Sequence, residues 1–230
     1  MDYTTEYWEK NPGMHIMDSQ KKADEIIKMI KGKNIKSILD VACGAGVITN
    51  IIKKHTKASI VVGIDISNVA ISKAIEYSNG ANINWIVKDI FNYKCDKKYD
   101  LIICMDVVEH IDNDIGFLRK LSELGTNIVI KVPIEKNTIN NILRKFTKID
   151  PWKEAEKRYG HIHHYSNLEF SEKLKLCRLY IEKEGYIALP KRTRLLFEII
   201  RVIFLPLSLF SKKLVLSTIG GFKIYLLKSL

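Results

Sequence analysis

Short apolar runs and amphipathic stretches alternate along the chain from about residue 18 to residue 133. Apolar positions at helical spacing predict helices at about 18–31, 47–55, 68–78 and 115–124, and compact apolar runs predict strands at 37–41, 60–64, 84–87, 99–105 and 127–132. The run at 99–105 is almost wholly apolar, as expected of a central strand buried on both faces. This alternation predicts an α/β, doubly wound, Rossmann-like fold with a mainly parallel, seven-stranded sheet and helices on both faces.

The regular alternation stops after Pro133. Residues 135–166 read as an irregular segment, and a stretch of this length between regular elements usually serves a function. Beyond it, the pattern predicts a helix at about 168–184 that stops at Gly185, a strand at 186–189 and a last strand at 222–227. We therefore expect one domain over 1–230, composed of an N-terminal helical segment at 1–34, a cofactor-binding core at 35–133, a substrate-side insertion at 134–166 and a C-terminal part at 167–230.

Composition places the chain among ordinary globular proteins. Its 230 residues are 47% hydrophobic and 27% charged, which excludes a disordered or fibrous chain. The four cysteines form no CxxC pair and are expected to be reduced intracellular thiols. The N-terminus is polar and lacks the apolar stretch of a signal peptide, so we expect a cytoplasmic protein.

The net charge of +11 predicts an acidic partner, and it is concentrated in the tail. Residues 185–230 carry eight basic residues and one acidic residue, beside the nearly uncharged apolar run from Val202 to Ser211. One interpretation is an interfacial segment that contacts an anionic membrane surface, which would make the protein peripheral at the membrane. The other is a helix that covers the sheet edge with its basic residues in solvent. Nucleic acid is not excluded as a partner.

The most informative motif is LDVACGAG at residues 39–46, at a junction between a strand and a helix. Open α/β sheets bind ligands at such junctions, and glycines let a ligand approach the backbone. A dinucleotide site would need a third glycine, where this chain has Thr49. Asp40 would repel a pyrophosphate but attract a ligand with a cationic group. These two residues disfavour a nucleotide-dependent oxidoreductase.

Acidic residues also follow the next strands. Asp65 ends the second strand, where a carboxylate can accept hydrogen bonds from both ribose hydroxyls of an adenosine group. Asp89 follows the third strand, and is placed to meet the adenine edge. The segment DVVEHI at 106–111 follows the buried fourth strand. Acidic or glycine residues at the ends of four successive strands indicate a site for an adenosine-containing ligand more specifically than any one of them alone.

The chain resembles class I S-adenosylmethionine-dependent methyltransferases in LDVACGAG at 39–46, GIDIS at 63–67, KDI at 88–90 and YDLIICMDVVEHI at 99–111. It is most similar to the branch that acts on small molecules, lipids, quinones and sugars. The resemblance implies S-adenosylmethionine as cofactor. Its methionine end would lie at Asp40, Ala42, Cys43 (in place of a frequent glycine), Gly44 and Gly46. The ribose would lie at Asp65 and Ile66, the adenine at Asp89 and Ile90, and the sulfonium beside Met105.

The segment GHIHHYS at 160–166 supplies the candidate catalytic residues. His161 and His163 stand at alternate positions of an extended chain and would point the same way. Either could be a general base, because histidine titrates near neutral pH, or the segment could only close a lid and cap the next helix through Ser166 or Asn167. No Cys or Asp is spaced to complete a zinc site, so no metal is expected. Glu109 and His110 are interpreted as a local brace rather than a catalytic pair.

The sequence therefore predicts an S-adenosylmethionine-dependent methyltransferase that acts on an oxygen or nitrogen of a small-molecule, sugar or lipid-linked acceptor. The acceptor would lie among Tyr3, Tyr7, Trp8, residues 135–166 and part of the tail. A nucleic-acid methyltransferase is one alternative, although no Asn-Pro-Pro-Tyr-type motif follows the fourth strand. A methyltransferase-like binding module without activity is another, and the intact acidic and glycine markers argue against it.

Overall fold

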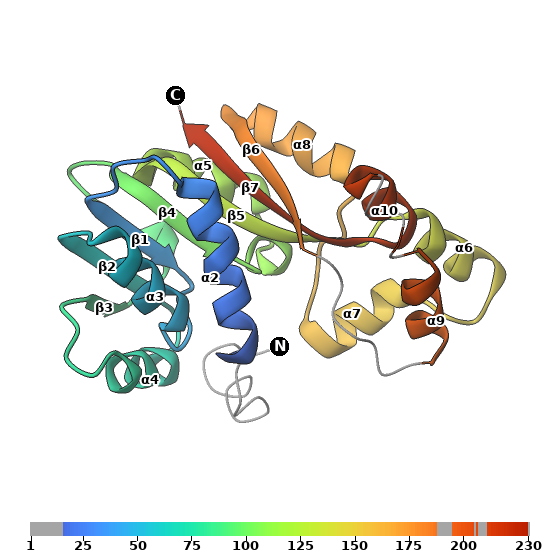
Figure 1. The fold of residues 1–230 in the computed structure, drawn as a ribbon, viewed down its shortest axis with the longest axis horizontal. Helices are drawn as coiled ribbons and strands as arrows, with labels where there is room; N and C mark the ends of the chain where they lie inside the picture. The colour runs from blue at the N-terminus through green and yellow to red at the C-terminus, as the bar shows by residue number, and fades with distance from the viewer. Residues whose placement is uncertain (1–15, 188–194, 205, 207–210, 230) are drawn as a thin grey trace.

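The computed structural model describes residues 16–187, 195–204, 206 and 211–229 (Figure 1). Its centre is one seven-stranded sheet in the order β3-β2-β1-β4-β5-β7-β6. The strands are β1 (Ser37–Val41), β2 (Ile60–Asp65), β3 (Asn84–Val87), β4 (Tyr99–Met105), β5 (Gly125–Ile134), β6 (Leu179–Ile187) and β7 (Gly221–Ser229). The predicted doubly wound sheet of seven strands is confirmed.

Strands β1 to β5 pair in parallel, and β7 runs antiparallel between β5 and β6. The order along the sheet reverses at β1, which lies between β2 and β4. At such a reversal the loops after neighbouring strands separate and leave a crevice at the carboxyl ends of the strands. The fold thus places the predicted motifs around one crevice.

Helices cover both faces of the sheet (Figure 1). On one face lie α2 (Ile16–Ile30) and α3 (Val47–Thr56), with α4 (Asn68–Ser78) beside α3; on the other lie α5 (Asp114–Leu124) and α8 (Asn167–Leu176). Ala23 and Ile26 of α2 are fully buried against the first face, and Phe117 of α5 and Phe170 of α8 against the second. Two apolar cores therefore hold the sheet between them.

The predicted helix at 168–184 is wrong in its second half. Helix α8 ends at Leu176, Arg178 takes a left-handed backbone conformation with φ 55°, and β6 begins at Leu179. The predicted helix stop Gly185 lies inside β6, where a Cβ would come within 2.6 Å of Met29 and 2.9 Å of Ile224. Pairing with β7 and close packing of α2 outweigh the local helical preference, so these residues adopt an extended conformation. The predicted strand at 186–189 overlaps the end of β6, and its residues 188–189 lie outside the described residues.

The expectation of an irregular segment at 135–166 is also wrong. It contains α6 (Thr138–Phe146) and α7 (Pro151–Tyr159), capped by the side chains of Asn137 and Asp150. These helices gather at one end of the molecule with α9 (Leu195–Phe204) and α10 (Lys212–Ile219) (Figure 1). Thr138 donates a hydrogen bond to the backbone carbonyl of Ser217 at 3.0 Å, which ties α6 to α10.

The C-terminal half carries an exposed apolar surface. Val202 and Ile203 on α9 are 57% and 62% exposed, and Phe146 at the end of α6 is exposed as well. Within the part of the chain that the structure describes, no helix has the length and apolar character needed to span a bilayer. Tyr3, Tyr7, Trp8 and the basic residues Lys191, Arg192 and Arg194 lie outside the described residues.

Candidate active site

A cavity of about 1520 Å³ opens at the carboxyl ends of β1, β2, β4 and β5. Its lining joins the loop after β1, the ends of β2 and β4, the start of α2, and helix α7. Most of the predicted cofactor residues meet here, namely Asp40, Ala42, Cys43, Gly44, Asp65, Ile66, Asp89, Ile90 and Met105. Tertiary structure brings together residues that are up to 65 positions apart in the sequence.

The loop between β1 and α3 is fixed in an unusual backbone path. Ala42 and Gly44 both have φ 55°, a left-handed conformation that glycine adopts without strain. The backbone N–H of Gly44 donates to Asp65 Oδ2 at 3.0 Å, and the N–H of Ser67 donates to Oδ1 of the same carboxylate at 2.9 Å. Asp65 therefore holds the β1 loop against the end of β2, while it also lines the cavity.

Gly46 is the one predicted cofactor residue that the described part of the cavity lining lacks, and the structure shows a packing role for it. A Cβ at this position would meet the Trp85 ring at 2.4 Å and Ala74 at 2.9 Å, and the backbone has φ 71°. The glycine is thus required for close packing of the loop on β3 and α4.

Asp40 presents a carboxyl group that is ready for a cationic ligand. The residue is 4% exposed, and Thr49 Oγ1 donates to its Oδ2 at 2.5 Å. Burial raises the pKa of Asp40 to about 7, and the hydrogen bond from Thr49 opposes that rise. A positive ligand group beside Asp40 would stabilise the carboxylate. The sequence pattern identified Asp40 but not its partner Thr49.

The side expected to hold adenosine is more open. Asp89 is exposed, and its Oδ1 accepts a hydrogen bond from the Phe91 N–H at 2.9 Å at the start of the short helix η1 (Ile90–Asn92). Phe91 also lines the cavity and is half exposed, so its ring offers a surface for a flat ligand group. The sequence reading did not single out Phe91, although it is the next residue after the KDI motif.

A buried ion cluster lies beside Met105. Asp106 pairs with Lys22 of α2 at 2.9 Å and with Lys131 of β5, and all three residues line the cavity. Burial acts to raise the pKa of Asp106, but the charges of Lys131 and Lys22 outweigh it and hold that pKa below its usual range. No sequence pattern indicates this cluster, because its members come from three elements that are distant along the chain.

The structure separates the two candidate histidines. His161 lines the cavity, whereas His163 is absent from the described lining. His163 Nε2 lies 3.0 Å from the carbonyl oxygen of Ile111 and 3.1 Å from that of Asp112, and its ring stacks on Tyr165. A ring nitrogen that donates to backbone carbonyls is committed to structure. His161 is therefore the histidine of this pair that can meet an acceptor.

Backbone hydrogen bonds place the His161 segment over the short helix η2 (Val108–His110). The N–H groups of Ile162 and His163 both donate to the carbonyl of Glu109, at 3.0 and 3.1 Å. Ser166 then caps α8 with reciprocal hydrogen bonds to Glu169, as the capping interpretation predicted. The segment thus crosses from α7 to α8 with His161 held next to Glu109.

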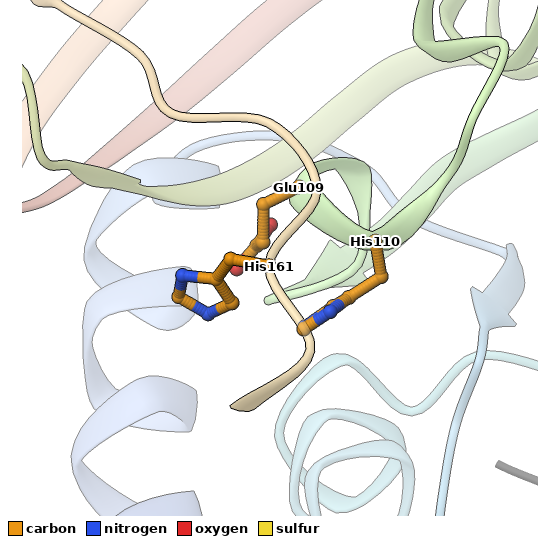
Figure 2. A group of neighbouring side chains, drawn as sticks. All are labelled: Glu109, His110 and His161. Atoms are coloured by element: carbon orange, nitrogen blue, oxygen red, sulfur yellow. The ribbon is translucent and has the colours of Figure 1, made fainter. Parts of the chain in front are cut away.

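Glu109, His110 and His161 form a compact group at the cavity wall (Figure 2). One side-chain ligand atom from each lies within 4.8 Å of the others. Glu109 is 1% exposed, and its Oε2 has no hydrogen-bond partner among the described residues. Burial, and next the charge of Asp106, raise the pKa of Glu109 to about 8, while burial lowers the pKa of His110 to about 4.

Glu135 connects this group to α7. Its Oε1 lies 3.0 Å from His161 Nδ1 and its Oε2 lies 2.6 Å from His164 Nδ1. The His164 ring stacks on Trp152 of α7 at 5.1 Å, and the Trp152 indole N–H donates to the Glu135 carbonyl. Sequence reasoning missed Glu135, although it directly follows β5, at the sheet end where ligand residues collect.

Comparison with known proteins identifies the fold and its cofactor side. The model of a methyltransferase domain family matches residues 38–125. The chain contains a class I S-adenosylmethionine-dependent methyltransferase domain. The match covers β1 through the start of β5, which is the part that carries the Asp40, Asp65 and Asp89 motifs.

Two curated relatives of this methyltransferase domain are O-methyltransferases. The ubiquinone biosynthesis O-methyltransferase of Rickettsia conorii is 34% identical over 97 residues, which is 42% of this chain and 34% of the relative. The malonyl-[acyl-carrier protein] O-methyltransferase 1 of Ilyobacter polytropus is 34% identical over 104 residues, 44% of this chain and 39% of the relative. The chain matches at most half the length of the first relatives compared.

Solved structures extend the likeness to the whole methyltransferase fold. The magnesium protoporphyrin IX methyltransferase of Synechocystis PCC 6803, solved with bound SAH, superposes with a TM-score of 0.60 at 14% identity. The superposition covers 94% of this chain and 83% of that protein. The likeness therefore includes β6 and β7, which lie beyond the matched family model.

Proposed function

We propose that this protein transfers the methyl group of S-adenosylmethionine to a hydroxyl oxygen of a small, largely apolar acceptor. One observation carries the proposal: the same cavity is lined by the predicted cofactor motifs and by the group around His161 and Glu109. Cofactor and acceptor can thus meet without a rearrangement of the sheet. The oxygen acceptor is favoured over nitrogen because both of the named curated relatives are O-methyltransferases.

The residues present fit the cofactor. The buried Asp40 carboxyl suits the ammonium group of the methionine end, and the left-handed loop at Gly44 brings backbone close to the cavity. Asp65 suits a ribose diol, and Asp89 with Phe91 suits an adenine ring. When bound, S-adenosylmethionine supplies a methyl group that its sulfonium already activates. The protein must then hold an acceptor oxygen in line, about 3 Å from the methyl carbon.

The other half of the cavity fits an acceptor with an apolar body. A single cofactor or drug-sized ligand usually occupies about 300–1,000 Å³, so a volume of about 1520 Å³ leaves room for a second molecule. Tyr159 of α7, Ile219 of α10 and Phe222 of β7 line this half. Lys157 and Arg158 lie at its α7 wall and favour an acceptor that also carries a negative group.

His161 is the proposed general base. Its Nδ1 faces the Glu135 carboxylate at 3.0 Å, so Nδ1 carries the proton and Nε2 is left to accept one from the acceptor. Glu135 acts through His161 and is a positioning residue. His163 is not proposed as the base, because its ring nitrogen is held by two backbone carbonyls.

The exposed apolar surface of α6 and α9 favours an acceptor that is delivered from an anionic lipid surface. Val202 and Ile203 are more than half exposed, and the tail supplies most of the net positive charge. Helices α6, α9 and α10 stand at the same end of the molecule as α7, which borders the acceptor half of the cavity (Figure 1). A nucleic-acid surface would account for the basic residues but not for the exposed aliphatic ones.

The test has two stages. Calorimetry of the full chain with S-adenosylmethionine, and with NAD as the mismatched ligand, should show binding of the first alone. Methyl transfer from radiolabelled donor into a fractionated lysate of the host should then label an organic-soluble product with an ether-linked methyl group. A chain that binds neither ligand, or that labels only RNA, would contradict the proposal.

A further inference from the structure

We propose that Glu109, His110 and His161 bind one divalent transition-metal cation in the wall of the cavity that also contains the predicted cofactor residues. Each residue contributes one ligand atom, and these atoms lie within 4.8 Å of one another (Figure 2). Ligands of a cation with bonds of about 2.0–2.2 Å are separated by up to about 4.4 Å, so only small side-chain rotations are needed. This inference deepens the proposed function and rests on it for the role of the cation, but not for its binding.

Hydrogen bonds already orient both imidazoles for coordination. His110 Nδ1 lies 3.1 Å from the carbonyl oxygen of Gly160, and His161 Nδ1 lies 3.0 Å from Glu135 Oε1. In both rings, therefore, Nδ1 carries the proton and Nε2 presents the lone pair. Histidine ligands of metals in proteins are held in this manner, by a carbonyl or a carboxylate on the second ring nitrogen. Each imidazole thus has one ring nitrogen bonded to a carbonyl or carboxylate oxygen and a second ring nitrogen with the lone pair that a cation requires.

The carboxylate of Glu109 supplies the independent observation. Its Oε2 is buried and has no hydrogen-bond partner within the described residues, although Glu109 lies in the cavity wall. A buried polar atom without a partner is destabilising, so folded proteins rarely retain one without a purpose. A cation between Glu109 and the two imidazoles would satisfy this atom. The interpretation of Glu109 and His110 as a local brace does not account for it.

The ligand set indicates the class of cation. Two neutral imidazoles and one carboxylate suit Zn²⁺, Mn²⁺, Fe²⁺ or Co²⁺, whereas Mg²⁺ and Ca²⁺ prefer oxygen ligands. Three protein ligands leave further coordination positions, as in catalytic rather than structural sites. His110 and His161 reach the site from two segments, with ring centroids 5.0 Å apart. The neighbouring Asp106 carboxylate is already paired with Lys22 and Lys131, so Glu109 supplies the negative charge of this site.

The cation would hold and activate the acceptor hydroxyl. A hydroxyl oxygen bound to a divalent cation loses its proton near neutral pH. That proton passes to solvent, the oxygen forms a C–O bond to the methyl carbon, and the C–S bond of the cofactor breaks. The products are the methyl ether, S-adenosylhomocysteine and one proton, so atoms and charge balance. With the cation bound, His161 Nε2 is a ligand and no longer accepts the proton; the cation instead lowers the pKa of the hydroxyl. Loss of His161 lowers turnover in either case.

Cobalt is the probe, because Co²⁺ bound to imidazole and carboxylate absorbs visible light. The full chain, freed of any purification tag and treated with a chelator, is titrated with Co²⁺ and followed by absorbance and calorimetry. We expect one ion per chain. Glu109→Gln should lower the affinity by at least about 100-fold, and Glu135→Gln, which acts on the second ring nitrogen of His161, by about 10–100-fold.

His163→Gln is the matched control, since it changes a histidine two residues from His161 that does not face the cavity, and it should keep the Co²⁺ affinity. His110→Gln provides a second ligand variant if Glu109→Gln does not fold. Saturable binding that both ligand variants leave unchanged, or no saturable binding below about 1 mM, would overturn the metal site. S-adenosylmethionine calorimetry on the same samples tests the proposed cofactor site separately, because Asp40, Asp65 and Asp89 are not among the three metal ligands.

Discussion

The Glu135 carboxylate and the His161 imidazole meet at 3.0 Å across 26 residues of sequence. Glu135 comes directly after β5, and His161 follows α7, so the whole of α6 and α7 lies between them. The contact makes Nδ1 the protonated nitrogen of the neutral His161 ring. It also ties the helical insertion to the sheet end that carries the cofactor motifs. The chemistry proposed for this site depends on that connection.

His161 and His163 should differ sharply on substitution. We expect His161→Ala to lower turnover by about 10²–10⁴-fold, the usual contribution of a general base, while affinity for S-adenosylmethionine stays within a few-fold. His163→Ala should keep most of the turnover, because its ring bonds to backbone carbonyls away from the cavity. Labelled methyl transfer measures both. Equal losses in the two variants would mean that the segment acts only as a lid.

Asp65→Ala should weaken S-adenosylmethionine binding by roughly 10–100-fold, which corresponds to lost charged hydrogen bonds of about 1.5–3 kcal/mol. Part of that loss will arise from the β1 loop, because Asp65 also accepts the Gly44 N–H. Calorimetry provides the affinity and a thermal melt provides the stability. Asp100→Ala is a suitable control, since Asp100 accepts backbone N–H groups at the opposite end of β1. Unchanged affinity in Asp65→Ala would remove Asp65 from the ribose site.

Cofactor affinity should rise with pH through the titration of Asp40. Its pKa is raised to about 7, so the carboxyl is mostly neutral at pH 5.5 and half ionised at pH 7. Because a cationic ligand group prefers the carboxylate, affinity should increase by about tenfold over that interval. The interval stays below the range in which the α-amino group of the ligand loses its charge. In Asp40→Asn the affinity measured by calorimetry should be lower and should not change between pH 5.5 and pH 7. If the affinity of this variant rose with pH as in the unchanged protein, another group would be responsible for the titration.

The tail should bind anionic vesicles in a salt-dependent manner. Attraction of about 1 kcal/mol per basic residue near the surface fades as salt screens it, while exposed aliphatic side chains enter the interface. Co-sedimentation at low salt should therefore exceed that at high salt and that with neutral vesicles. Replacing Val202 and Ile203 together by Asp should remove most of the binding, whereas Ile75→Asp on α4 should not, although Ile75 is equally exposed. Absence of binding to anionic vesicles at low salt would contradict membrane contact.

The sequence by itself determined the sheet and most of the cofactor side. Period-two and period-3.6 patterns are local, and Asp40, Asp65 and Asp89 each lie at or just past the carboxyl end of a strand, so one topological rule places them together. The helix predicted at 168–184 failed because the antiparallel partners of β6 lie 35 to 50 residues away, in β7. A local pattern carries no information about such a partner.

Only the tertiary structure decided the acceptor side. Alternation along an extended chain predicted that the His161 and His163 side chains point the same way. In the folded chain, the Glu109 carbonyl accepts the backbone N–H groups of Ile162 and His163, and the His163 ring bonds to the Ile111 carbonyl instead of lining the cavity. The group of Glu109, His110 and His161 joins segments 51 residues apart, and its unpartnered buried oxygen is visible only once the chain has folded. Burial and long-range hydrogen bonds, which depend on the whole fold, set this chemistry.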